Sequence, residues 1–141
     1  WKITLNTGGA IDPPYRVGDT VYATYSPFMV GTKEEVTGTV MLNSNYTIDF
    51  SKLERGSDLW LFYQVTDFGP KMENLQVVLT SGFDGRVWYT KDPVAKTITI
   101  HGSSSGEVSY RLTANGWNWR SWGNIAKDLN ISSYPDMGEK K

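Results

Sequence analysis

The chain has 141 residues, of which 39% are hydrophobic and 13% are aromatic, a composition typical of an ordered globular domain rather than a disordered chain. Fourteen Lys and Arg oppose fifteen Asp and Glu, and a formal net charge of -1 offers no cationic surface to a phosphate backbone, which argues against nucleic acid as a partner. No apolar run approaches the ~20 residues of a membrane span, and the absence of cysteine excludes disulfides and thiolate metal sites. We therefore expect one soluble domain over residues 1–141.

The first six residues, Trp1-Lys2-Ile3-Thr4-Leu5-Asn6, alternate between apolar and polar side chains. This period of two predicts a strand over residues 1–6 with one buried face. Residues 7–14 contain Gly8-Gly9 and Pro13-Pro14, which interrupt regular structure and predict a linker after that strand.

Eight further segments are rich in β-branched and aromatic residues and are bounded by Gly, Pro, Asn or Asp, as strands usually are. They cover residues 20–25, 35–42, 46–50, 59–66, 75–80, 86–90, 97–100 and 108–112. A hairpin turn is expected at Asn43-Ser44-Asn45. A second is expected between residues 80 and 86, where Asp84-Gly85 supplies the positive φ of a tight turn.

One short helix is expected over residues 123–129, where Ile125, Ala126 and Leu129 share a side. About nine short strands with no alternating helices predict an all-β, single-domain antiparallel β-sandwich of jelly-roll or immunoglobulin-like type, with at most this one helix near the C-terminus. A closed barrel is the competing arrangement.

Catalytic chemistry has few candidates in this sequence. The one histidine, His101, ends a strand beside a Gly- and Ser-rich loop at residues 102–106, and no nucleophile-elbow motif accompanies it. The acidic residues single out no pair for glycoside hydrolysis. We therefore expect no catalytic residue and no cofactor, although loop carboxylates leave a structural calcium ion open.

The most informative segment is Trp117-Asn118-Trp119-Arg120-Ser121-Trp122, which holds three of the six tryptophans. On an extended segment Trp117 and Trp119 would face the same way. If exposed, such rings would stack on sugar rings while Asn118 and Arg120 bind hydroxyls. The alternative is that these rings cap the core and that Arg120 stacks on one of them.

Two further tryptophans suggest a second aromatic surface. In a strand over residues 59–66 both faces would be hydrophobic, so one face must be covered or must bind something. Trp60, Phe62 and Trp88 on one sheet face would form the floor of a groove, whereas a loop packed over them would bury the same rings.

In its size, all-β pattern and surplus of Trp and Tyr, the chain resembles the β-sandwich carbohydrate-binding modules that are attached to or secreted with polysaccharide-degrading enzymes. The resemblance implies a non-catalytic protein that binds a polysaccharide or glycan. From the residues themselves, the expected ligand-binding side chains are Trp117, Trp119, Trp122, Asn118, Arg120, Trp88 and Trp60.

Secretion is expected on two grounds. The chain starts at Trp1 rather than Met, and it carries the glycosylation sequons Asn45-Tyr46-Thr47 and Asn130-Ile131-Ser132. An alternative function fits the same location: an extracellular fibre, pilus or surface-layer subunit that self-assembles by donating residues 1–6 to a neighbour's sheet.

Overall fold

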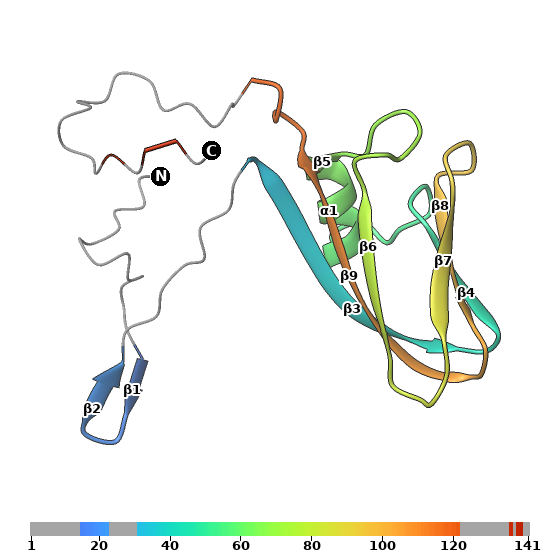
Figure 1. Cartoon of the computed structure of the whole chain (residues 1–141), viewed down its shortest axis with the longest axis horizontal. Coiled ribbons are helices and arrows are strands. Elements are labelled where there is room, and N and C mark those ends of the chain that lie inside the picture. Colours follow the sequence, from blue (N-terminus) through green and yellow to red (C-terminus); the bar gives the residue numbers. More distant parts are fainter. Residues whose placement is uncertain (1–14, 23–30, 122–135, 137, 140–141) are drawn as a thin grey trace. The chain divides into compact units, whose positions relative to one another are not determined.

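The computed structural model describes residues 15–22, 31–121, 136 and 138–139 (Figure 1). The chain divides into two compact units, Trp1–Val30 and Gly31–Lys141, which are described separately. In the first unit β1 (Tyr15–Val17) pairs antiparallel with β2 (Thr20–Tyr22). The strand β2 confirms the start of the strand predicted over residues 20–25. The strand predicted over residues 1–6 and the linker at 7–14 lie outside the described residues.

The second unit contains two antiparallel sheets. In the four-stranded sheet β9 (Gly106–Gly116) is bordered on one side by β3 (Lys33–Leu42) and on the other by β5 (Thr66–Asp67) and β6 (Gln76–Ser81). The three-stranded sheet has the order β4 (Asn45–Asp49), β8 (Thr97–Gly102), β7 (Val87–Asp92). Six predicted strands are thus confirmed, and the second unit is a mostly β, sandwich-like arrangement.

The two predicted hairpins are wrong, although both turns exist. The strand β3 pairs with β9 while β4 pairs with β8, and β6 pairs with β9 while β7 pairs with β8. The turns therefore carry the chain from one sheet to the other, as does the connection from β8 to β9. All three connections lie at the same end of the unit, which we call the closed end (Figure 1).

The core fills the space between the two sheets. Along β8 and β9 every second residue is buried, so one face of each strand points inward and the other outward. The largest cluster of buried side chains, drawn from both sheets and from the segments between them, comprises Val36, Ile48, Phe50, Phe62, Phe68, Met72, Leu75, Ile98, Tyr110, Leu112 and Ala114. Leu42, Ile100 and Val108 continue the core towards the closed end.

One close approach inside the four-stranded sheet requires a glycine. Gly38 on β3 lies directly opposite Tyr110 on β9, and the Tyr110 ring occupies the space that a side chain at position 38 would fill. Tyr110 is only 8% exposed, so the ring packs in the core by covering the glycine. Burial raises the pKa of the Tyr110 hydroxyl above its ordinary value.

The strand predicted over residues 59–66 is wrong, because Asp58–Val65 form the helix α1. The Ser57 hydroxyl caps the helix by accepting a hydrogen bond from the Trp60 amide at 3.2 Å, and Asp58 lies in the first turn, where a negative charge is favourable. The helix buries Phe62 in the core, with Leu59 and Tyr63 packed beside it. It lies at the end of the unit opposite the three connections, which we call the open end (Figure 1).

No helix within the described residues is long and apolar enough to cross a membrane. The helix predicted over residues 123–129 lies outside the described residues.

Candidate functional site

The tryptophan cluster does not form an extended segment. After β9 the chain turns twice: the Trp119 amide donates to the Gly116 carbonyl at 3.0 Å, and the Ser121 amide donates to the Asn118 carbonyl at 2.9 Å. The prediction that Trp117 and Trp119 face the same way on an extended segment is therefore wrong. Trp117 is 70% exposed, whereas Trp119 is half-buried, so the two rings have different environments.

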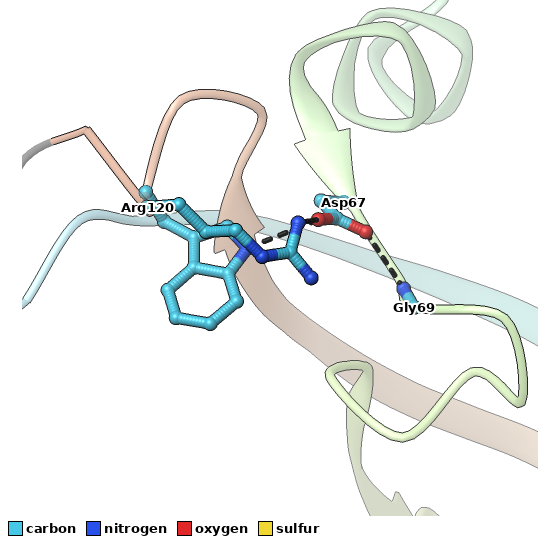
Figure 2. A network of polar contacts seen from close by, with 4 residues as sticks. Asp67, Gly69 and Arg120 are labelled. Atoms are coloured by element: carbon cyan, nitrogen blue, oxygen red, sulfur yellow. Dashed lines mark hydrogen bonds and ion pairs between the residues drawn. The ribbon is translucent and has the colours of Figure 1, made fainter.

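Trp119 is held by a polar network centred on Asp67 (Figure 2). One carboxylate oxygen of Asp67 accepts from the Trp119 indole nitrogen at 3.0 Å and from Arg120 at 2.9 Å. The other oxygen accepts from the Gly69 amide at 2.9 Å. The Trp119 hydrogen bond, followed by that of Gly69, holds the pKa of Asp67 below its ordinary value.

The network also occupies one face of the Trp119 ring, because the Arg120 guanidinium lies over it at 4.6 Å from the ring centre. The expectation that Arg120 stacks on a tryptophan is therefore confirmed. Trp119, Arg120 and Asp67 together attach the turns after β9 to the end of β5. In this arrangement Trp119 has a structural role. Of the two described tryptophans of the segment, Trp117 is the exposed one. Asn118 is half-buried, and Trp122 lies outside the described residues.

The expected row of Trp60, Phe62 and Trp88 on one sheet face is wrong. Trp60 and Phe62 lie on α1, where Trp60 is half-buried and Phe62 is 4% exposed. Trp88 lies on β7 and is 46% exposed. The three rings therefore do not share a sheet face, and only Trp88 presents an aromatic surface there.

Trp88 has a specific neighbour on the outer face of the β4-β8-β7 sheet. It lies directly opposite His101 on β8, and the two rings stack with centres 5.6 Å apart and planes inclined by 15°. The His101 Nε2 atom is 2.9 Å from the Thr90 hydroxyl, two residues along β7 from Trp88. Stacking and this hydrogen bond orient both rings before any ligand arrives.

The rest of this outer face consists mainly of small hydrogen-bonding side chains. Thr47, Thr99 and Thr90 form one row across the three strands, and the hydroxyls of Thr47 and Thr99 are 3.0 Å apart. We use the name β4-β8-β7 face for the nine outward positions of these strands. In rows across the sheet they are Asn45, His101 and Trp88; Thr47, Thr99 and Thr90; and Asp49, Thr97 and Asp92.

Charge on this face is confined to its last row. Asp49 and Asp92 are carboxylates, and none of the nine positions is Lys or Arg. Asp49 accepts from both the hydroxyl and the amide of Ser51, and these bonds lower its pKa. Asp92 accepts from the amides of Val94 and Ala95, which fixes the turn between β7 and β8. The row nearest to that of Trp88 consists of the three threonines Thr47, Thr99 and Thr90.

Sequence reasoning included Trp88 but missed His101 and the threonines as its neighbours. The missing step was the register of β7 and β8, which form a hairpin around residues 93–96 with Asp92 opposite Thr97. Counting back from that pair places Trp88 opposite His101. The proline in Asp92-Pro93 was a turn signal in the sequence that would have supported this pairing.

Among the described residues, no group of three or more His, Cys, Asp or Glu side chains is arranged to hold a metal ion. Comparison of the chain with models of protein families, with curated proteins and with solved structures found no significant match. Functional interpretation therefore depends on the residues and their geometry.

Proposed function

We propose that this protein is a secreted, non-catalytic carbohydrate-binding domain and that a neutral polysaccharide or glycan binds the β4-β8-β7 face. The observation that carries the proposal is the stacked pair of Trp88 and His101 beside a row of threonine hydroxyls. A sugar ring has an apolar face that stacks on an indole and hydroxyls around its edge that donate and accept hydrogen bonds. This face supplies both kinds of partner side by side.

The Trp88 side chain is 46% exposed. Among the described strands β7 pairs with β8 alone, so no strand is hydrogen-bonded to the edge of β7 away from His101. The stacking with His101 keeps the ring in one orientation, which reduces the side-chain entropy lost when a ligand binds. Trp88 is thus both exposed and pre-oriented, as a sugar-stacking residue needs to be.

The charges favour an uncharged ligand. An anionic glycan would meet Asp49 and Asp92 at one end of the face, where Asp49 is paired with Lys52 at 3.4 Å, and it would meet no Lys or Arg among the nine positions. Threonine hydroxyls instead match sugar hydroxyls, because each can donate as well as accept. We therefore assign neutral glucans, xylans and mannans as the ligand class to be screened first.

Trp88 is a better candidate than the Trp117 cluster that the sequence favoured. Trp117 is more exposed, but the neighbouring Trp119 and Arg120 are bound to Asp67 and to each other. Of the two hydrogen-bonding groups expected to accompany the Trp117 ring, Arg120 is thus already bound to Asp67. The groups beside Trp88 lie on an open sheet face.

The experiment compares two exposed tryptophans in one protein. Trp88→Ala is expected to weaken binding to the best of the neutral polysaccharides in affinity electrophoresis by about tenfold, equivalent to about 1.4 kcal/mol. Trp117→Ala, the matched control, should retain the affinity of the parent. Retardation of the parent on no polysaccharide would refute the proposal. Loss of binding in Trp117→Ala alone would refute the β4-β8-β7 face and favour the cluster.

A second candidate function is the assembly subunit that accepts a donated strand. It is favoured by β3, a ten-residue strand that pairs with β9 alone among the described strands. Residues 34–37 of β3 line a groove of about 340 Å³ with Asp58, Leu61, Phe62 and Val65 of α1. An extended segment with alternating apolar residues, such as residues 1–6 of another copy, would fit such an edge.

This second function predicts oligomers that depend on the first six residues. Sedimentation velocity of the full chain and of a variant lacking residues 1–6 distinguishes the two candidates. A full chain that remains monomeric at all concentrations would exclude strand donation between copies. Binding of polysaccharide by both proteins would leave the carbohydrate-binding proposal intact.

A further inference from the structure

A separate pocket lies at the open end of the second unit. Its volume is about 240 Å³, and it is lined by Tyr63, Asp67, Phe68, Gly69, Pro70, Met72, Pro93 and Lys96. The lining residues come from α1, β5, the loop at residues 68–75 and the turn between β7 and β8. None of them belongs to the β4-β8-β7 face, so the pocket is a different surface from the one proposed above.

The walls of the pocket are rigid. In the loop, the Met72 amide donates to the Gly69 carbonyl at 3.0 Å and the Asn74 amide donates to the Phe68 carbonyl at 2.9 Å. From the other sheet, the Lys91 ammonium donates to the Met72 carbonyl at 2.7 Å and also to the Leu75 carbonyl. Lys91 therefore fixes this loop against β7, and its burial there lowers the pKa of the ammonium.

The opposite walls are fixed by other contacts. The Tyr63 ring stacks on Phe50 with centres 5.5 Å apart and meets Phe68 edge-on at 5.4 Å. The turn at residues 93–96 is held by the Asp92 carboxylate and by a hydrogen bond from the Phe50 amide to the Lys96 carbonyl at 3.1 Å. A ligand would enter a preformed cavity, so little ordering would oppose its binding.

The size of the pocket suits a small ligand such as a single ring. Drug-sized ligands occupy cavities of about 300 Å³ or more, and this pocket has about 240 Å³. The flat apolar surfaces of Tyr63, Pro70 and Pro93 suit one face of a ring. Among the lining residues, the Tyr63 hydroxyl can donate and accept hydrogen bonds, and the Lys96 ammonium can donate them.

We propose that this pocket is a second sugar site that binds a single pyranose, such as the end residue of a glycan chain, independently of the β4-β8-β7 face. A flat protein surface can bind internal segments of a polysaccharide, because the polysaccharide can extend beyond the surface in both directions. A pocket of about 240 Å³ instead has little room beyond one ring, which suits the end residue of a chain.

The test is a titration of the ¹⁵N-labelled full chain with the methyl glycosides of glucose, xylose, mannose and galactose. For at least one glycoside, the amide resonances of Gly69, Met72 and Lys96 should shift in a saturable way. Two variants should weaken this binding severalfold: Tyr63→Phe, which keeps the ring and removes the hydroxyl, and Lys96→Asn, which removes the ammonium. Lys96 has φ +56°, a conformation that asparagine also adopts.

Val94→Ala is the matched control, because Val94 lies in the same turn, is 95% exposed and does not line the pocket. It should bind the glycosides as the parent does. Two results would overturn the second site. The first is the absence of any saturable shift at these amides with every glycoside in large molar excess, and the second is a set of shifts confined to the row of Trp88. Affinity electrophoresis of the Trp88 variant tests the β4-β8-β7 face, whereas the glycoside titration tests the pocket. Failure of one proposal can therefore be distinguished from failure of the other.

Discussion

Replacement of Trp119 by Phe removes one hydrogen bond of the Asp67 network. Phe keeps an aromatic ring at this position, but the ring is smaller than the indole and lacks the N–H that donates to Asp67. Hydrogen bonds to charged groups contribute roughly 1.5–3 kcal/mol, and partial solvation lowers this value. The Asp67 side chain is 26% exposed and keeps its bonds from Gly69 and Arg120, so we expect a loss of about 1 kcal/mol.

Trp119→Ala should cost more because the ring is lost as well. Removal of a fully buried aromatic side chain costs about 3–5 kcal/mol, so a half-buried one accounts for about 2 kcal/mol. The lost cation–π contact with Arg120 adds about 0.5 kcal/mol at an exposed site. Together with the hydrogen bond, the expected loss is about 3.5 kcal/mol.

Urea unfolding followed by far-ultraviolet circular dichroism measures these differences without relying on the fluorescence of the altered residues. Trp117→Ala serves as the control and should change the free energy of unfolding by less than about 0.5 kcal/mol, since the ring is 70% exposed. The reasoning is refuted if Trp119→Phe is as stable as the parent. It is also refuted if Trp117→Ala and Trp119→Ala are equally destabilised.

Two further predictions concern the same network and the core. Because the pKa of Asp67 is lowered in the folded state, its stabilising effect is complete above its unfolded value of about 3.8 and is lost as the pH falls through the folded value. Urea titrations between pH 7 and pH 2 should therefore show a smaller loss of stability on acidification in Asp67→Asn than in the parent, and equal losses would contradict the assignment. Gly38→Ala should cost about 1–3 kcal/mol because the Tyr110 ring must move. In a Tyr110→Leu background the same change should cost clearly less, and equal costs in both backgrounds would show that the ring is not the obstacle.

The strands were predictable because one of their faces is buried and the other is not. Along β9 the buried residues Val108, Tyr110, Leu112 and Ala114 alternate with exposed ones, and that period of two is visible in the sequence. The helix α1 was missed for the opposite reason. Leu59, Trp60, Leu61, Phe62 and Tyr63 are all apolar, so the spacing of the buried Phe62 and its neighbours is hidden among exposed hydrophobic residues such as Leu61.

The pairing of the strands was less predictable than their positions. A tight turn with Asp84-Gly85 is typical of a hairpin, yet the Gly82 amide donates to the Glu107 carbonyl of β9, and the next strand joins the other sheet. Local turn chemistry specifies that the chain reverses. It does not specify which sheet the returning strand joins, because that depends on which buried faces come together.

The candidate site was predicted in part for a related reason. The sequence shows that Trp117, Trp119 and Trp122 are close along the chain, but it does not show which indole is hydrogen-bonded within the protein. Asp67 lies 52 residues before Trp119, and the hydrogen bond between them gives this indole a structural role. Trp88 appeared isolated in the sequence because His101, its stacking partner, is on the following strand.

The alternation of β7 and β8 also separates the residues that stabilise the sandwich-like unit from those proposed to bind sugar. Ile98 and Ile100 point inward and are fully buried, whereas Thr99 and His101 between and beside them point outward. A change at an outward position removes no core contact, so the β4-β8-β7 face can vary in its ligand while the inward positions keep the sheet in place. On β8 the backbone that holds His101 opposite Trp88 is anchored by the buried Ile98 and Ile100. The β4-β8-β7 face is therefore supported by the core, and under the proposed function we expect its backbone to move little on glycan binding.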